Sequence, residues 1–188
     1  MPKPCGRQFF ANPGPTNIPD SILRAIDRPA QDFMEEPFVA LVRDCTARLK
    51  RVLGTSGEVF MMASSGHGAW EASLVNLFSP GDTLLMLESG YFSESWTEMA
   101  RKFGLRVETV AADRRRGVDP AAVEAALRAD SGHAIKAVCS VHNETSTGVT
   151  VPQTAIRAAI DAAKHPALLL SDTISSLGSM PFRMDEWG

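Results

Sequence analysis

Four consecutive apolar residues, Leu84-Leu85-Met86-Leu87, follow Thr83 and lead into Glu88-Ser89-Gly90. A second run of this kind, Ala167-Leu168-Leu169-Leu170, leads into Ser171-Asp172. Strands that are apolar at every position are typical of sheets covered by helices on both faces, because both sides of such a strand are buried. The two runs therefore predict an α/β protein with a mostly parallel sheet and helices on both faces.

Short apolar runs alternate with stretches of helical spacing along most of the chain. The expected strands are residues 58–62, 83–87, 107–111, 135–141 and 167–170. The expected helices are residues 19–26, 38–53, 69–78, 93–103, 120–129 and 153–164. Residues 12–17 are too rich in Pro, Gly and Asn for either element, so they predict an ordered loop.

Composition and charge narrow the class of protein. Hydrophobic residues make up 44% and charged residues 22% of the 188 residues, as in ordinary globular proteins. The 19 basic and 22 acidic residues are well mixed, which argues against binding to nucleic acid or to an anionic membrane. The cysteines, Cys5, Cys45 and Cys139, are too far apart to suggest a disulfide framework or a metal site, and they fit a reducing compartment. Because residues 1–10 lack an apolar signal core and no apolar run approaches the roughly 20 residues of a membrane span, a cytoplasmic location is expected.

In open parallel sheets, ligands bind at the carboxyl ends of the strands, so the loops after the expected strands are the candidate binding positions. After residues 58–62 the chain continues as Ser64-Ser65-Gly66-His67-Gly68 and opens into a helix. Backbone N–H groups at such a turn, together with the helix dipole, can hold a phosphate. The same small residues also serve any tight turn between a strand and a helix, so both interpretations stay open.

Three further loops carry aromatic or polar groups. Tyr91 and Phe92 follow the second expected strand, where one ring could stack on a planar ligand or simply pack inward. His142-Asn143-Glu144-Thr145-Ser146-Thr147-Gly148 holds more donors and acceptors than turn capping requires. Asp172 leaves an apolar strand, so its carboxylate needs a partner, either a structural donor or the protonated pyridine nitrogen of a ligand. Together these loops fit a phosphorylated aromatic cation, and pyridoxal 5'-phosphate (PLP) is such a ligand.

The polar loops are also similar to motifs of a known family. Four stretches carry this similarity: Ser65-Gly66-His67-Gly68, residues 142–148, residues 171–178 and Met184-Asp185-Glu186-Trp187-Gly188. They resemble the class V, fold-type I PLP-dependent aminotransferases, within them the serine–glyoxylate and alanine–glyoxylate aminotransferase branch. The resemblance implies the large PLP-binding domain of that fold and transamination of serine or alanine with glyoxylate, which gives glycine and a 2-oxo acid.

The resemblance further implies which residues contact the phosphate and the hydroxyl of the cofactor. Ser65, Gly66 and His67 would hold the phosphate. Thr145 would lie near the ring hydroxyl.

Other residues would contact the cofactor ring or the substrate. Asp172 would pair with the pyridinium nitrogen, Phe92 would stack on the ring, and Ile174 would pack on its other face. Pro13 and Gly14 would contact the substrate from an active-site loop. Phe92 departs from the Trp that alanine–glyoxylate enzymes carry there, although a phenyl ring can also stack.

The same resemblance places the Schiff-base lysine of the family beyond Gly188. The lysines present are Lys3, Lys50, Lys102, Lys136 and Lys164. Each falls in a helix, at a strand start or in the N-terminal tail, so no catalytic residue is expected among them. Because transamination needs a lysine to hold the cofactor and to move a proton, the chain alone is expected to be inactive.

The expected organisation follows from this placement. Residues 1–30 would form an N-terminal segment with the active-site loop, and residues 31–188 would form a partial PLP-binding domain, truncated at the C-terminus. The small C-terminal domain would be absent. Family members are homodimers, so the resemblance also implies a homodimer for the complete enzyme.

Two alternatives remain open from the sequence. The chain could be a module that holds PLP noncovalently, or one half of a split enzyme. It could also serve another class V reaction, such as aminoethylphosphonate transamination or cysteine desulfuration. The latter needs a cysteine in a mobile loop, and none of the three cysteines lies in a plausible one.

Overall fold

A computed structural model describes residues 10–188, so Lys3 and Cys5 lie outside the described residues. The chain divides into two compact units, residues 1–45 and 46–188. α2 (Glu36–Leu53) begins in the first unit and ends in the second.

The first unit contains the predicted loop at residues 12–17. The backbone N–H of Phe10 donates to Asn17 Oδ1 at 2.8 Å, and Asn12 Nδ2 donates to the carbonyl of Gly14, also at 2.8 Å. The loop is therefore held by its own side chains, as an ordered loop should be.

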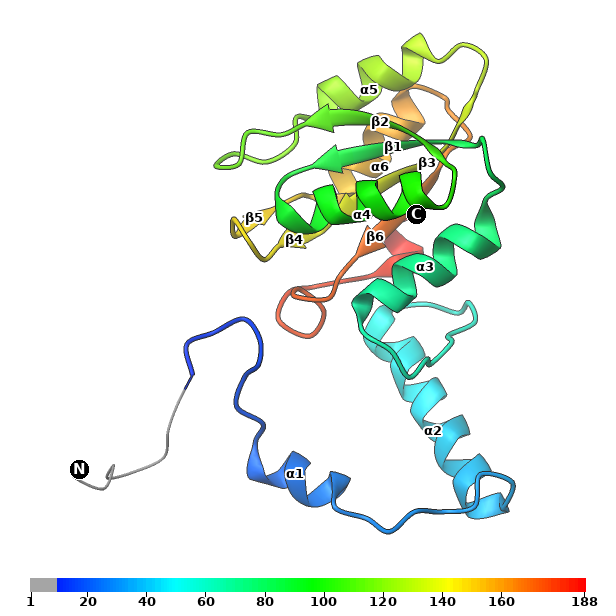
Figure 1. The fold of residues 1–188 in the computed structure, drawn as a ribbon, viewed down its shortest axis with the longest axis vertical. Helices are drawn as coiled ribbons and strands as arrows, with labels where there is room; N and C mark the ends of the chain where they lie inside the picture. The colour runs from blue at the N-terminus through cyan, green and yellow to red at the C-terminus, as the bar shows by residue number, and fades with distance from the viewer. Residues whose placement is uncertain (1–9) are drawn as a thin grey trace, which may run out of the picture. The chain divides into compact units, whose positions relative to one another are not determined.

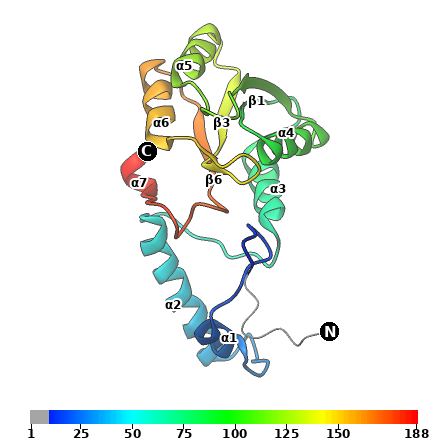
Figure 2. The same cartoon turned by 90° about the vertical axis from the view of Figure 1, so that its left-hand side faces the viewer.

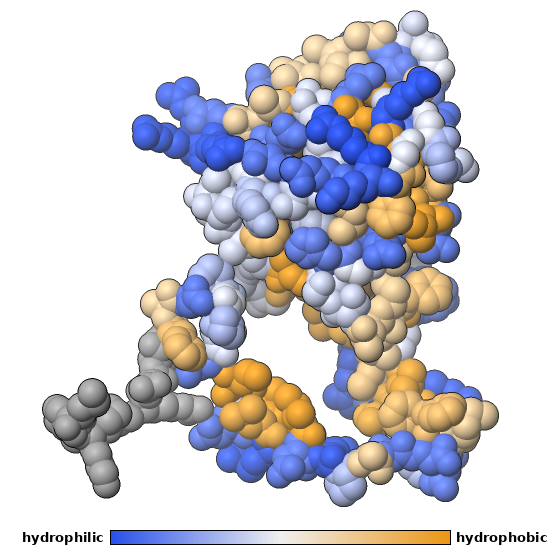
Figure 3. Space-filling view, in the orientation of Figure 1, coloured by the Kyte–Doolittle hydropathy of each residue, from blue (hydrophilic) through white to orange (hydrophobic). Residues whose placement is uncertain are grey.

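α1 (Asp20–Ile26) follows this loop. Apolar side chains gather on one of its faces and stay exposed, which Figure 3 shows. They are Ile22, Leu23 and Ile26. An exposed apolar face on a short helix is a feature of surfaces that meet a partner.

Four strands form one parallel sheet in the second unit (Figure 1). They are β1 (Thr83–Glu88), β2 (Arg106–Ala111), β3 (Ile135–Val141) and β6 (Leu168–Asp172), in the order β2-β1-β3-β6. Every neighbouring pair runs parallel. The predicted α/β class and parallel sheet are confirmed.

Helices cover both faces of the sheet (Figure 2). α3 (Gly66–Leu77) and α4 (Tyr91–Lys102) pack on one face, and α5 (Pro120–Ala129) and α6 (Gln153–Ala162) pack on the other. β1 contributes to both layers because its side chains alternate. Leu84 and Met86 join the first core, and Leu85 and Leu87 join the second.

A short antiparallel hairpin and a final helical turn complete the unit. β4 (Asn143–Glu144) pairs with β5 (Val149–Thr150), where the sequence predicts only a loop. Gly148 closes the turn with φ +75°, a conformation that favours glycine, and its N–H donates to the carbonyl of Glu144 at 2.7 Å. α7 (Met184–Trp187) was not expected from the sequence.

The prediction of a strand at residues 58–62 is wrong. These residues form no strand, and the side chain of Phe60 is 82% exposed. A strand is stable only when a neighbouring strand takes its backbone hydrogen bonds, and no described segment pairs with this one. The turn at Ser65 and Gly66 is therefore preceded by unpaired backbone instead of a strand.

Among the described residues, no helix has both the length and the apolar character that crossing a bilayer would require. Within residues 10–188, His, Cys, Asp and Glu side chains do not come together in threes as a metal site would need.

Candidate functional site

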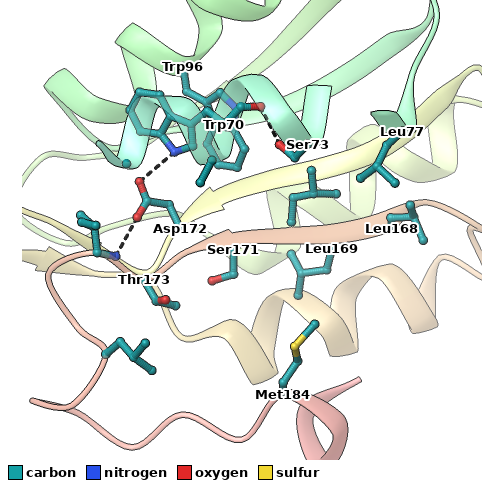
Figure 4. A pocket seen from close by; sticks show the side chains of 15 residues that line it. Trp70, Ser73, Leu77, Trp96, Leu168, Leu169, Ser171, Asp172, Thr173 and Met184 are labelled. Atoms are coloured by element: carbon teal, nitrogen blue, oxygen red, sulfur yellow. Dashed lines mark hydrogen bonds between the residues drawn. The ribbon is translucent and has the colours of Figure 1, made fainter. Parts of the chain in front are cut away.

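A pocket of about 630 Å³ opens beside the carboxyl end of β6 (Figure 4). Its walls come from α3, β6 and the loop after β6, with single residues from α4 and α7. The lining residues are Gly66, Ala69, Trp70, Ser73, Leu77, Trp96, Leu168, Leu169, Leu170, Ser171, Asp172, Thr173, Ile174, Leu177 and Met184. The lining is mostly apolar, with one carboxylate, as is usual for small-molecule sites.

Asp172 is that carboxylate, and two donors hold it. Oδ2 accepts from the indole Nε1 of Trp70 at 2.9 Å, and Oδ1 accepts from the backbone N–H of Ile174 at 2.8 Å (Figure 4). Asp172 is half-buried and makes no ion pair with any described residue. A carboxylate can accept about four hydrogen bonds, so Asp172 retains acceptor capacity at the pocket.

Trp70 is fixed between two other rings. Its indole stacks on that of Trp96, with ring centroids 5.4 Å apart and planes 7° apart. The ring of His67 lies on it at 4.5 Å. The indole of Trp70 therefore joins α3 to α4 and carries its N–H to the end of β6.

The amino end of α3 meets the loop after β6. Ser65, the residue before the helix, makes no side-chain capping hydrogen bond, and its carbonyl accepts from the N–H of Gly68 at 2.9 Å, so the N–H groups of Gly66 and His67 stay open to an anion. A Cβ on Gly66 would lie 3.4 Å from Cδ1 of Ile174, and a Cβ on Gly68 would lie 2.0 Å from Oγ of Ser64. The contact at Gly66 is an ordinary one, whereas the turn before α3 leaves no room for a Cβ at Gly68 while the Ser64 side chain keeps its position.

A second carboxyl group, that of Glu144 in β4, follows the end of β3 and is fully buried. It accepts hydrogen bonds from the backbone N–H groups of Phe92 (3.3 Å), Ser93 (3.2 Å) and Ser146 (3.2 Å). The hydroxyls of Ser146 (2.7 Å) and Ser93 (3.4 Å) also donate to it. Two of the three N–H groups belong to the first turn of α4, where the helix dipole favours a negative charge.

This Glu144 cluster, made of Glu144, Ser93 and Ser146, sets the positions of two predicted site residues. Phe92 takes part through its backbone N–H, and its ring packs against the core of Trp70 and Trp96. Thr145 is the residue between Glu144 and Ser146. The cluster explains why α4 begins at Tyr91, before the predicted start at residue 93.

Polar groups at the end of β3 also hold the loop that follows Asp172. The Nδ1 of His142 and Oγ of Ser176 are 2.9 Å apart, and Asn143 Nδ2 donates to Oγ of Ser175 at 2.9 Å. His142 is buried, and this burial lowers its pKa. The imidazole is thus held neutral, and it fixes the loop without adding a charge.

The structure brings some of the predicted residues to one pocket and leaves others around it. Gly66, Asp172 and Ile174 line the pocket. Ser65 and His67 flank Gly66 at the amino end of α3.

The remaining predicted residues lie elsewhere. Phe92 and Thr145 belong with the Glu144 cluster and do not line the pocket. Pro13 and Gly14 lie in the other unit, residues 1–45.

Sequence reasoning missed two residues. Trp70 supplies the only side-chain donor that a described residue gives to Asp172, and Glu144 holds α4. The sequence does indicate a role for Glu144, since it is the one acid in the polar run 142–148. The indication for Trp70 is weaker: it is a large aromatic residue one helical turn after Gly66.

None of the residues that line the pocket is a lysine. Lys50 lies in α2 and pairs with Glu58 at 3.2 Å, Lys102 ends α4, and Lys136 lies near the start of β3. Lys164 follows α6. These positions match the prediction that each described lysine lies away from a strand's carboxyl end.

The described cysteines are also unsuited to act as catalytic nucleophiles. Cys139 is buried in β3, and burial raises the pKa of its thiol to about 12. Cys45 lies within α2. Neither belongs to a mobile loop, and a thiol with a raised pKa is a poor nucleophile.

A parallel α/β sheet with a pocket at strand ends, a carboxylate and an open helix amino end defines a site for a small ligand that carries both a cation and an anion. The family model for aminotransferase class V matches residues 9–188, and the chain belongs to this family. Enzymes of this family depend on PLP.

The chain is similar to curated and solved aminotransferases. It is 46% identical to serine–glyoxylate aminotransferase of Methylorubrum extorquens, over 97% of this chain and 46% of that protein. It is 45% identical to L-aspartate–glyoxylate aminotransferase of Paracoccus denitrificans, over 94% of this chain and 45% of that protein. The crystal structure of alanine–glyoxylate aminotransferase from Nostoc sp. matches with a TM-score of 0.87 and 28% identity, over 100% of this chain and 49% of that one. The chain thus spans about half the length of the relatives it matches.

The residues at the pocket fit PLP on observations of this structure. Asp172 has acceptor capacity left for a pyridinium N–H. Gly66 leaves space that a Cβ would fill next to Ile174.

Proposed function

We propose that this chain is the cofactor-holding part of an enzyme that transfers an amino group from a small amino acid, serine or alanine, to glyoxylate. The products would be glycine and a 2-oxo acid. The observation that supports this proposal most is Asp172, a carboxylate at the end of a parallel strand that is held by two donors and faces a pocket.

When bound, PLP withdraws electrons from the α-carbon of the amino acid, which makes its proton acidic. Asp172 would keep a proton on the pyridine nitrogen through its free acceptor capacity. Ser65, Gly66 and His67 would bind the phosphate at the amino end of α3.

The flat part of the cofactor would be held from its sides. Ile174 and Phe92 would contact the two faces of the ring, and Thr145 would lie near the ring hydroxyl. Pro13 and Gly14 would contact the substrate. The neutral His142 and the Glu144 cluster would keep these groups in place, since they hold the loops that carry them.

Glyoxylate is the proposed acceptor because the three relatives named above share it. Their donors differ, being serine, L-aspartate and alanine. A donor that varies among relatives fits a site in which other parts of the protein contact the amino acid side chain. Serine is favoured as donor by the relative that is 46% identical.

The lysine that binds PLP covalently in this family is, we propose, none of the lysines of this chain. No lysine lines the pocket. Transamination needs an amine both to hold the cofactor and to carry the proton between carbon atoms. The chain by itself would therefore bind PLP reversibly and would not transaminate.

A PLP titration of the 188-residue chain tests the proposal. We expect saturable binding by absorbance, at least about tenfold weaker binding for Asp172→Asn, and no lysine adduct after borohydride reduction and mass spectrometry. Asp119→Asn is the matched control, since it makes the same change at the N-cap of α5, where Asn is equally suited. Equal affinities for wild type and Asp172→Asn would refute the assignment of Asp172, and glycine formed from serine and glyoxylate would refute the inactivity.

A homodimer is proposed as the assembly of the complete enzyme. The exposed apolar face of α1 supports it, because such a face is costly in water. Light scattering of the complete enzyme at several concentrations tests this, and a concentration-independent monomer would contradict it.

A further inference from the structure

We propose that Trp70 is a positioning residue that orients the Asp172 carboxylate toward the pyridinium nitrogen of PLP. This inference rests on the proposed function and adds a specific role for the indole N–H. Trp70 touches Asp172 directly and acts on the cofactor only through it.

Two donors from different elements fix the plane of the carboxylate. The Ile174 N–H, from the loop after β6, binds Oδ1 at 2.8 Å, and the Trp70 indole, from α3, binds Oδ2 at 2.9 Å. With only the Ile174 bond, the carboxylate could still turn about its Cβ–Cγ bond. The second bond removes this freedom and leaves one acceptor position on each oxygen.

The indole is itself immobile before any ligand arrives. Trp70 is 5% exposed and is packed between the parallel ring of Trp96 and the ring of His67. The loss of side-chain freedom therefore occurs during folding and not during binding, which is how a preorganised site gains affinity.

The stacked pair provides its own control. Trp96 is 2% exposed, and its Nε1 has no hydrogen-bond partner among the described residues, whereas the Nε1 of Trp70 binds Asp172. Replacing either indole by phenyl keeps an aromatic ring in the stack. Only Trp70→Phe removes a hydrogen bond to the carboxylate, so the two variants separate orientation from packing.

The contact can be tested without cofactor. The chain has three tryptophans, Trp70, Trp96 and Trp187, so a ¹⁵N–¹H spectrum shows three indole signals, which Trp→Phe variants assign. We expect Asp172→Asn to move the Trp70 signal and speed its hydrogen exchange, and to leave the Trp187 signal in place. A Trp70 signal that Asp172→Asn does not move would overturn the inference, and this readout needs no Trp70 variant to fold.

The effect on the cofactor is tested by PLP titration of the 188-residue chain. Trp70→Phe should weaken PLP binding about tenfold and lower the pH at which bound PLP loses its pyridinium proton. Trp96→Phe alters the stack but leaves the hydrogen bond from Trp70 to Asp172 in place, so it should weaken PLP binding less than Trp70→Phe does. Equal results for the two variants, with Asp172→Asn still weak, would overturn the role of Trp70 and leave the PLP site standing. If the wild-type chain fails to bind PLP, the proposed function falls and this inference falls with it.

Discussion

Glu144 lies in β4, just after the parallel strand β3, and Asp172 ends the neighbouring strand β6; the surroundings of these two acids differ sharply. Glu144 is fully buried and accepts five hydrogen bonds, all from within the protein. Asp172 is half-buried, accepts two, and faces the pocket.

The difference shows how acceptor saturation separates a structural acid from a ligand-binding one. A carboxylate whose acceptor positions are all used has nothing to offer a ligand, and it stabilises the fold. One that is oriented but unsaturated can receive a cation at little cost.

Glu144→Ala should lower the free energy of unfolding by about 3–5 kcal/mol, because it leaves buried N–H groups without acceptors. Urea unfolding followed by circular dichroism measures this. Glu144→Gln, which keeps one acceptor oxygen, should recover part of the loss. A loss below about 1 kcal/mol for Glu144→Ala would mean that water replaces the carboxylate and that the cluster is not structural.

Gly90→Ala tests the same cluster from its neighbour. A Cβ there would lie 2.6 Å from Ser146 Oγ and 2.7 Å from Glu144 Cγ. We expect a loss of about 2 kcal/mol, since the contacts must move apart. Gly132→Ala is the control, because a Cβ at Gly132 meets nothing within 4 Å. Similar unfolding free energies for the two variants would show that the cluster accommodates a Cβ at Gly90 with little loss of stability.

Asp172→Asn should reverse the pattern seen for Glu144. We expect the free energy of unfolding to change by only about 1 kcal/mol, because the amide oxygen still accepts one of the two bonds. PLP affinity should nevertheless fall, as the titration above measures. A stability loss as large as that of Glu144→Ala would place Asp172 among the structural acids and remove the contrast.

His142 gives the smallest effect and shows it as a dependence on pH. Burial lowers its pKa from 6.5, so the unfolded chain binds a proton more readily than the folded one. The contribution of His142 to stability is therefore complete above about pH 6.5 and decreases as the pH falls from 6.5 to 5.5. Urea unfolding at both pH values should show a smaller difference for His142→Asn. An unchanged difference would assign the pH effect to other groups.

The sequence alone predicted the sheet because its central strands, β1 and β3, are mostly apolar. Residues 83–87 and 135–141 lie where helices cover both faces of the sheet, so their mostly apolar composition indicates that they are buried. The segment at residues 58–62 has a similar local pattern but forms no strand, because pairing depends on a neighbour that local composition does not describe.

Single residues of the candidate site could be predicted from the sequence, but the hydrogen bonds that join them could not. Asp172 stood out since an acid after four apolar residues is conspicuous. The roles of Trp70 and Glu144 depend on partners 102 and about 50 residues away in the sequence. Hydrogen bonds of this range arise from the topology of the sheet, so single-residue patterns could not reveal them.

The Glu144 cluster limits how this site can be altered by exchange of parts. The strand β4, the hairpin turn and the first turn of α4 share one carboxyl group, so neither the hairpin nor the start of α4 can be transplanted alone. A hairpin grafted from another protein would need an acid at the position of Glu144 and a donor at that of Ser146, or it would leave the N–H groups of Phe92 and Ser93 without an acceptor. Substitutions in the polar loops at this edge of the sheet would therefore have to occur together, in evolution or in design.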